Sequence, residues 1–97
     1  MKKDRTMLDK AISNSDILPT GQKNILSIIG ASEYPVSSKH IEKAMGFTKQ
    51  TVNFSIKTLL NRKFIEREKD GVFVYKLNED RAIELIERYK ASLLAEK

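Results

Sequence analysis

Apolar residues recur every three to four positions in five segments of the chain, the spacing that places side chains on one face of a helix. Near the N-terminus, for example, Met7, Leu8, Ala11 and Ile12 follow this spacing. Each segment is therefore expected to form a helix that buries its apolar face. The helices predicted in this way cover residues 4–13, 22–29, 38–45, 48–62 and 79–94.

Two further segments are rich in β-branched and aromatic residues, which favour strands. They cover Phe64–Glu68 and Val72–Leu77, and the Asp70–Gly71 pair between them is a strong signal for a hairpin turn. Upstream, the residue before Pro35 is pushed toward extended backbone, so Val36 can add a short strand. The sequence therefore predicts a hairpin, extended to three strands if Val36 pairs with it.

Glycines and small polar residues mark the ends of several predicted helices. Gly30 is expected to end the second helix. Gly46 suits a tight turn between the third and fourth because glycine tolerates a positive φ. Thr48 and Asn78 are placed to cap the fourth and fifth helices. Two helices joined by a tight turn and followed by a hairpin form the outline of a winged helix-turn-helix.

This outline predicts an α+β fold that is mainly α: a winged helix-turn-helix with a two- to three-stranded wing and extra N- and C-terminal helices. Residues 18–77 form the winged domain, residues 1–17 an N-terminal helical extension and residues 78–97 a C-terminal helix. A chain of 97 residues has room for one such domain and a small core.

The C-terminal helix carries more apolar surface than so small a core is expected to cover. One interpretation is a homodimer held by the terminal helices, which would place two recognition helices roughly 34–36 Å apart on a palindromic site. The other is a monomer in which both terminal helices fold back on their own domain. The expected apolar stripe consists of Ala82, Ile83, Ile86, Tyr89, Leu93 and Leu94.

Positive charge is concentrated on the helix-turn-helix and wing. Residues 36–76 hold nine Lys and Arg against four acidic residues, a surplus equal to the formal net charge of +5 of the whole chain. Such a surplus attracts polyanions and releases counterions when a nucleic acid binds. Double-stranded DNA is therefore the leading candidate ligand, although a solvated, mildly basic surface would show the same charge.

The fourth helix, about residues 48–62, has the residues of a DNA-reading helix in the major groove. Lys49, Gln50 and Asn53 lie outside its predicted apolar face, and they offer the donors and acceptors that read guanine or adenine edges. Phe54 also lies outside, where it can meet a thymine methyl, or pack against the wing or a partner chain. Thr51 either completes the helix cap or donates to a phosphate.

The wing, residues 66–75, carries Arg67 and Lys69, which can reach a phosphate or the adjacent minor groove. Three acidic residues alternate with these cations along the same hairpin and partly cancel their charge. Two interpretations therefore stay open: a wing that clamps DNA, and a hairpin that only closes the core.

Residues 18–77 resemble the winged helix-turn-helix domains of MarR-type regulators, and are also similar to winged-helix domains at the C-termini of archaeal-type ATPases. The resemblance rests on LPTGQKNILSII, on SSKHIEKAMGFTKQTVNFSIKTLLNRKFIERE and on DGVFVYKL. It implies DNA binding by a small dimeric transcriptional regulator, for example a repressor. The implied phosphate contacts are Ser37, Ser38 and Lys39, and the implied reading face is Lys49, Gln50, Asn53, Phe54 and Lys57, with Lys69 at the wing tip.

The chain departs from that family at two points. Lys63 stands where the family usually has glycine before the first wing strand, and a left-handed backbone there would cost a lysine roughly 1 kcal/mol. The extra long helices of full-length MarR proteins are also missing, so their particular dimer and ligand pocket are not implied.

Composition and motifs bear on the remaining classes of function. The chain has no cysteine and no apolar run of the roughly 20 residues that span a bilayer, so a cytoplasmic protein is expected. No catalytic or metal-binding motif is present, and the single histidine, His40, lies among charged residues, so neither an enzyme nor a cofactor is predicted. The competing hypotheses are a winged helix that docks proteins and a DNA-binding accessory domain of a replication, partition or ATPase system.

Overall fold

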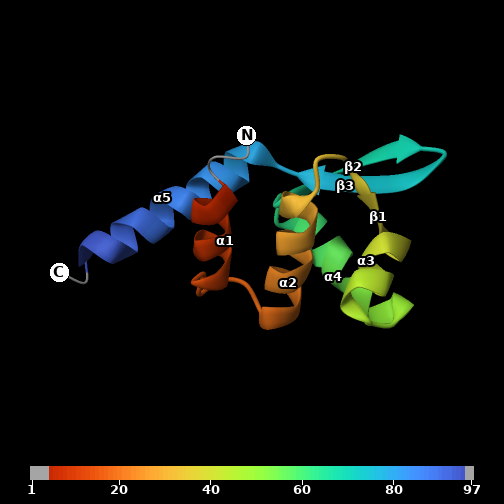
Figure 1. The fold of residues 1–97 in the computed structure, drawn as a ribbon, viewed down its shortest axis with the longest axis horizontal. Helices are drawn as coiled ribbons and strands as arrows, with labels where there is room; N and C mark the ends of the chain where they lie inside the picture. Colours follow the sequence, from red (N-terminus) through yellow and green to blue (C-terminus); the bar gives the residue numbers. More distant parts are fainter. Residues whose placement is uncertain (1–4, 96–97) are drawn as a thin grey trace.

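The structure is a computed structural model that describes residues 5–95. Residues 1–4 and 96–97, the outer ends of the predicted N-terminal extension and C-terminal helix, lie outside the described residues. Figure 1 shows the five helices and three strands that residues 5–95 form. Their bounds are α1 Arg5–Ser13, α2 Thr20–Ala31, β1 Val36–Ser37, α3 Ser38–Met45, α4 Lys49–Asn61, β2 Ile65–Asp70, β3 Val72–Leu77 and α5 Glu79–Ala95.

The three strands form one antiparallel sheet in the order β1-β3-β2. Strand β3 is central, because Tyr75 is paired with Val36 of β1 on one side and with Arg67 of β2 on the other. The hairpin closes at Gly71, whose φ of 77° lies in the left-handed region that favours glycine. The fold is therefore the mainly helical winged helix that the sequence predicts, and its wing has the third strand.

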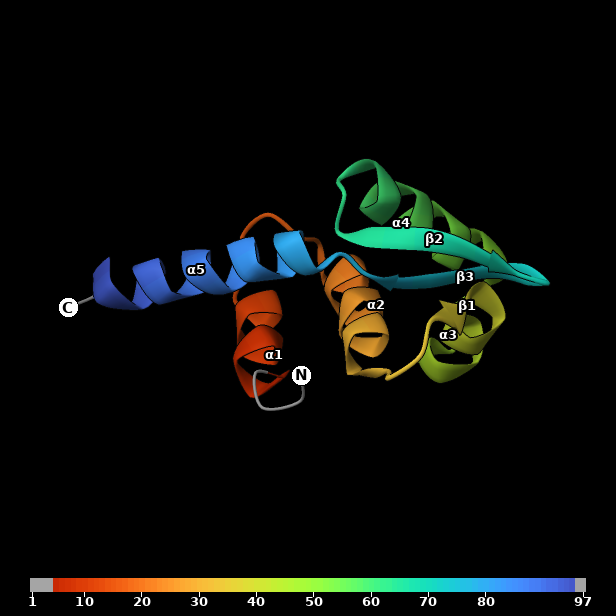
Figure 2. The same ribbon diagram turned by 90° about the horizontal axis from the view of Figure 1, so that it is seen from above.

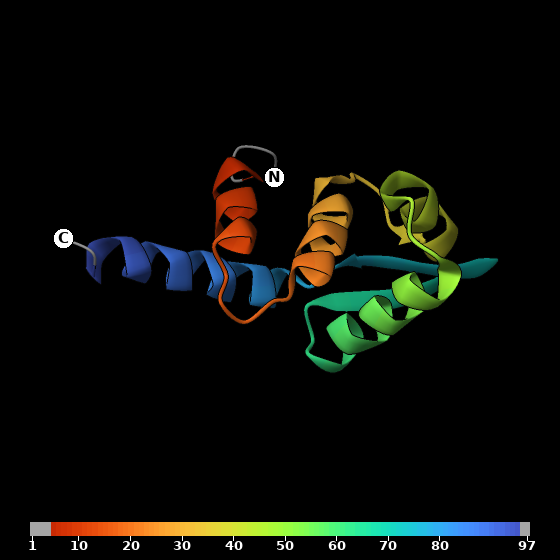
Figure 3. The same cartoon turned by 90° about the horizontal axis from the view of Figure 1, so that it is seen from below.

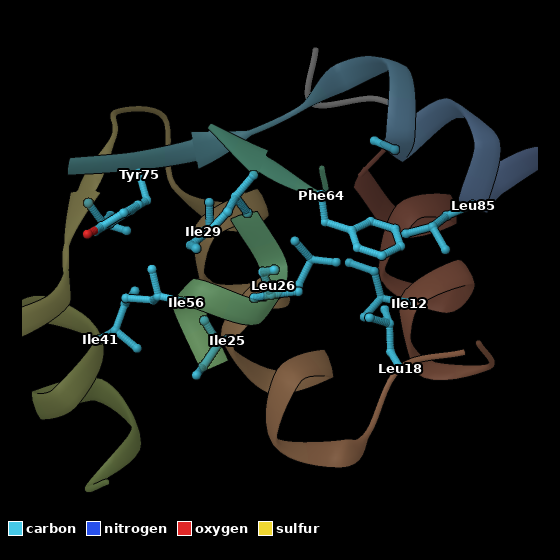
Figure 4. Packing of buried hydrophobic residues seen from close by; sticks show 14 of the residues in the cluster. Ile12, Leu18, Ile25, Leu26, Ile29, Ile41, Ile56, Phe64, Tyr75 and Leu85 are labelled. Atoms are coloured by element: carbon cyan, nitrogen blue, oxygen red, sulfur yellow. The ribbon is translucent and has the colours of Figure 1, made fainter. Parts of the chain in front are cut away.

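The hydrophobic core fills the space between this sheet and helices α2, α3 and α4. Figure 4 shows Tyr75 on the side of the sheet that faces Ile41 of α3 and Ile56 of α4. Ile25 and Leu26 of α2 are fully buried at its centre. Alternate residues of a strand face opposite sides, so the odd-numbered residues of β2 and β3 face these helices.

Helix α5 leaves the sheet and packs against α1, and its last turns extend beyond the rest of the molecule (Figures 1 and 2). The molecule is elongated, 47 Å by 24 Å by 22 Å. The C-terminal end of α5 lies at one end of the long axis, and the wing tip lies at the other (Figure 2). None of the helices formed by residues 5–95 has the length and apolarity that crossing a bilayer requires.

The sequence predicts that helix α2 ends at Gly30. In the structure, the helix continues to Ala31. A Cβ atom at position 30 would lie 3.4 Å from Cδ2 of Leu8 in α1, so this glycine stands where α1 packs closely against α2. That distance is an ordinary van der Waals contact, so Gly30 lies at the contact between α1 and α2 without being required by it.

The buried face of α5 is rotated relative to the predicted stripe. Ala82 and Leu85 are buried, whereas Ile83, which the stripe included, is 55% exposed. Leu85 packs with Ile12 and Phe64, as Figure 4 shows, because α1 and the turn before β2 lie on that side of α5. Ile83 and Leu94, the latter 72% exposed, stay uncovered by this chain.

The turn between α4 and β2 holds Lys63 at a φ of 68°, the left-handed conformation in which the family has glycine. The N–H of Phe64 donates to the carbonyl of Leu59 at 3.0 Å, and the N–H of Lys63 donates to that of Leu60 at 3.0 Å. These two bonds define a Schellman motif, which ends a helix with a left-handed residue. Lys63 therefore carries the steric cost of a Cβ at this position.

We expect Lys63→Gly to raise the free energy of unfolding by about 1 kcal/mol, because glycine adopts this φ without that steric cost. Lys63→Ala is the matched control, since it removes the same charge but keeps the Cβ. Urea unfolding at one fixed protein concentration measures both variants. An equal gain from alanine would show that lost charge, and not relief of backbone strain, is responsible.

Candidate nucleic-acid interface

The turn between α3 and α4 is fixed by its own backbone and hydroxyl groups. Gly46 has a φ of 68°, as the sequence predicts, and its N–H donates to the carbonyl of Glu42 at 2.8 Å. Thr48 caps α4: its Oγ1 accepts from the N–H of Thr51 at 3.2 Å. The Thr48 hydroxyl also donates to Oγ1 of Thr51 at 2.9 Å. These contacts fix where α4 begins and how it is rotated.

Helix α4 buries one face and exposes the other. The buried side chains of this helix are Val52, Ser55, Ile56 and Leu59. Opposite them lie the residues predicted to read DNA, which are all exposed: Lys49, Gln50, Asn53, Phe54 and Lys57. Helical periodicity thus gathers five candidate side chains on one surface, which we call the α4 face.

Phe54 projects from the α4 face with 68% of its surface exposed. It does not pack against the wing of its own chain, so that part of one sequence-based interpretation is wrong. An aromatic ring in this position leaves apolar surface in water until a ligand or a partner covers it. Gln50 lies one turn before Phe54 on the helix and Asn53 directly precedes it, and both are exposed, so apolar and hydrogen-bonding surface occur together on this face.

Helix α3 begins beside β1 with a capping serine. Oγ of Ser37 accepts from the N–H of His40 at 3.2 Å, so Ser37 is the cap of α3. A hydroxyl that accepts this bond still has its own proton to donate. Ser38 is half-buried, and Lys39 and His40 are exposed. The three candidate phosphate contacts Ser37, Ser38 and Lys39 therefore follow one another from the cap into the first turn of α3.

The outer face of the wing holds Glu66 and Glu68 in ion pairs with Lys76. Nζ of Lys76 lies 2.7 Å from Oε2 of Glu68 and 3.9 Å from Oε1 of Glu66. The hydrogen bond to Glu68, together with the charge of that carboxylate, raises the pKa of Lys76 above its usual value. Because Glu66, Glu68 and Lys76 are even-numbered, all three face away from the helices.

The opposite face of the wing carries its remaining cations. Arg67 and Lys69 are exposed, odd-numbered residues of β2, on the side that faces the helices. Both approach the ring of Phe73 on β3: the guanidinium carbon of Arg67 lies 4.4 Å from the ring centroid, and Nζ of Lys69 lies 5.4 Å from it. Sequence reasoning took Phe73 only as a strand former. Pairing of Lys69 with Phe73 across the hairpin is the signal that would have found it.

The first turn of α4 and the tip of the wing lie at the same end of the molecule, as Figure 3 shows. Helix α3 lies at that end as well. The structure thus brings the start of α4, helix α3 and the wing tip to one end, with the acids Glu66 and Glu68 on one face of the wing. Alternate residues of a strand face opposite sides, so these acids lie on the other face from Arg67 and Lys69. The face that carries Arg67, Lys69 and Phe73, which we call the inner face of the wing, is therefore more basic than the net charge of the hairpin indicates.

A half-open hollow of about 380 Å³ lies between α1 and α5, away from the α4 face. Ala11, Leu85 and Tyr89 supply apolar lining, and Arg88 at its rim lies 3.5 Å from a carboxylate oxygen of Asp16. Within residues 5–95, no group of three or more His, Cys, Asp or Glu side chains is placed to hold a metal ion.

Comparison with known proteins matches these features to one family. The model of the MarR family matches residues 15–72. A MarR/EmrR family transcriptional regulator from Acinetobacter sp. ADP1 has a TM-score of 0.64 and 20% identity, with 97% of this chain and 68% of that chain covered. An ArsR-like transcriptional regulator from Rhodococcus sp. RHA1 has a TM-score of 0.61 and 15% identity, with 97% and 86% covered.

A protein of unknown function from Listeria innocua Clip11262 is also similar, at 26% identity and a TM-score of 0.62, with 97% of this chain and 70% of that chain covered. No curated protein matches the chain.

We expect Thr48→Ala to lower the free energy of unfolding by about 1 kcal/mol, because the first turn of α4 loses the side chain that accepts from its N–H groups. Thr48→Ser keeps the hydroxyl and serves as the matched control, with most of the stability retained. Thermal unfolding followed by circular dichroism compares the two. Equal losses would show that the methyl group of Thr48, and not its cap, stabilises the helix.

Proposed function

The chain belongs to the MarR family, and from this premise we propose that it is a small dimeric transcriptional regulator that binds specific sequences in double-stranded DNA. The α4 face occupies the major groove, and the inner face of the wing contacts the backbone or the adjacent minor groove. The single observation that carries the proposal is the α4 face itself, where polar and cationic side chains are exposed together at the end that also holds the wing tip.

The chemistry of the α4 face suits base edges. Asn53 and Gln50 each present a donor and an acceptor, which can pair bidentately with adenine, and Lys49 can reach O6 or N7 of guanine. Phe54 supplies an apolar surface for a thymine methyl. If water alone covered the exposed face of α4, a side chain as large and apolar as Phe54 would have no role at the centre of that face.

Phosphate contacts are assigned to the residues around the α4 face. Those on α3 stand at its first turn, where free backbone N–H groups and the helix dipole attract an anion. Thr51 keeps a hydroxyl proton to donate while its oxygen accepts from Thr48. The complete proposed set of phosphate contacts is Ser37, Ser38, Lys39, Thr51, Lys57, Arg67 and Lys69, and the adjacent minor groove is the alternative for the two wing cations, Arg67 and Lys69.

Dimerisation is proposed through α5, because this helix leaves apolar side chains uncovered near both of its ends. Ile83 and Leu94 are more than half exposed, and Leu93 is 42% exposed. A helix of 17 residues is roughly 25 Å long, more than α1 alone can cover. A second copy of the chain would bury this stripe and place a second α4 face on the same side of the DNA.

The experiment that tests DNA reading is selection from a pool of random duplexes at several salt concentrations. We expect a palindromic motif to be enriched. Asn53→Ala should then relax specificity at one base pair of that motif, at a cost of about 1–3 kcal/mol, with little change in salt dependence. Lys57→Ala should weaken binding to all sequences alike and lower the salt slope by about one unit.

Each contrary result has a distinct meaning. Weak, salt-sensitive binding without enrichment would leave an accessory or architectural role in DNA binding. No binding even at low salt would favour a module that docks proteins, in which Phe54 enters a protein interface. Equal effects of Asn53→Ala and Lys57→Ala on all sequences would show that the proposed orientation of α4 in the groove is wrong.

We expect Leu94→Glu to raise the dimer dissociation constant by roughly tenfold or more, because a buried leucine contributes about 1.5–3 kcal/mol. Ala95→Glu places the same charge on the next residue, roughly 100° around the helix, and should have a smaller effect. Sedimentation equilibrium over a range of protein concentrations measures both. A monomeric wild-type protein, or equal effects of the two variants, would contradict dimerisation through this stripe.

A further inference from the structure

The inner face of the wing holds an aromatic ring in contact with two cations. Phe73 is 46% exposed, so it belongs only in part to the core. The guanidinium carbon of Arg67 lies 4.4 Å from its centroid, and Nζ of Lys69 lies 5.4 Å from it. Lys69 is paired directly with Phe73 across the hairpin, whereas Arg67 reaches the ring diagonally from the pair that it forms with Tyr75.

The two cations differ in what the ring does for them. A guanidinium is planar and can lie over an aromatic face at close range while the N–H donors at its edges remain free. An ammonium is compact and strongly hydrated, and here it lies 1 Å farther away. The ring therefore restricts Arg67 more than Lys69, and it does so without using the hydrogen bonds of the guanidinium.

Restriction of Arg67 matters because long side chains lose rotamer freedom when they bind a ligand. An arginine already held over a ring has lost part of that freedom in the free protein, so less is lost on binding. The neighbouring surface favours an anionic ligand as well, because the acids Glu66 and Glu68 are paired with Lys76 on the other face.

We propose that Phe73 is a positioning residue that holds Arg67 for the narrow minor groove of A·T-rich DNA beside the sequence that α4 reads. A narrow minor groove has enhanced negative potential and attracts an inserted arginine. The wing extends past the helices and so can reach DNA beside the groove that α4 occupies (Figure 2). This inference rests on the proposed function, and it adds specificity for a flanking sequence that no helix residue contacts.

The test compares duplexes that share the selected motif and differ only in A·T-tract or G·C flanks. The wild-type protein should prefer A·T flanks. Phe73→Leu should reduce that preference by roughly two- to fivefold, the effect expected of one exposed cation–π contact. Phe73→Tyr keeps an aromatic face and should keep the preference. The salt slope should not change in either variant, because no charge is lost.

A second measurement separates positioning from general support of the wing. In an Arg67→Ala background, Phe73→Leu should have no further effect on flank preference, because the residue through which Phe73 acts is gone. In the free protein, the Arg67 side-chain protons should show ring-current shifts that Phe73→Leu abolishes and Phe73→Tyr retains. Nuclear magnetic resonance on the full chain gives this readout without DNA.

Failure of this inference is distinguishable from failure of the proposed function. A wild-type protein that bound no duplex would overturn both. A wild-type protein that bound the motif without preferring A·T flanks would overturn the inference alone. The same holds if Phe73→Leu kept the full preference, or if it lowered affinity equally with and without Arg67.

Discussion

Burial of Phe64 is the interaction on which the relative placement of α4, the wing and α5 depends. Its ring is only 1% exposed, and the guanidinium carbons of Arg62 and Arg81 lie 5.4 Å and 4.3 Å from its centroid. Its N–H donates to Leu59 at the end of α4, and its carbonyl accepts from the N–H of Asn78 just before α5, at 2.9 Å. One buried residue thus ends a helix, precedes a strand and holds the start of the next helix. Core packing, and not a flexible linker, therefore sets how the wing lies relative to α4.

Periodicity in the sequence was enough to predict the helices, since each has one buried face, and residue chemistry was enough to predict the left-handed turn at Gly46. Two features needed the fold. The first is the end of α2, which the sequence places at Gly30, whereas the helix continues to Ala31 and Gly30 lies next to Leu8 of α1. The second is the buried face of α5. An amphipathic pattern predicts how wide an apolar stripe is, but the partner helix determines which residues of the stripe are buried. Packing of α1 buries Leu85 and leaves Ile83 exposed.

Residues of the candidate site were predictable to different degrees on the helix and on the hairpin. A helix with one buried face must expose the rest, so the α4 face followed from the sequence. On the hairpin, the positive and negative charges nearly cancel when they are counted along the sequence. The strand register places them on different faces: Lys76 pairs with Glu66 and Glu68 on one face, and Arg67 lies on the other. The sequence predicts a hairpin at Asp70–Gly71, but the contact between Arg67 and Phe73 is diagonal in the observed register, in which Arg67 is paired with Tyr75, and it depends on how the two side chains lie.

The uncovered apolar side chains of this chain have different neighbours at the two ends of the molecule, and the neighbours indicate what would cover them. Phe54 stands among amides and ammonium groups, and a DNA groove presents methyl groups and hydrogen-bond acceptors within a few ångströms of one another. Ile83 and Leu94, in contrast, lie on the same side of α5, and their uncovered apolar surface matches another helix better than it matches a nucleic acid. A core as small as this one cannot cover both regions from within. The distribution of exposed apolar surface thus supports a division of the molecule into a DNA-reading end and an assembly end, with Phe64 in the rigid connection between them.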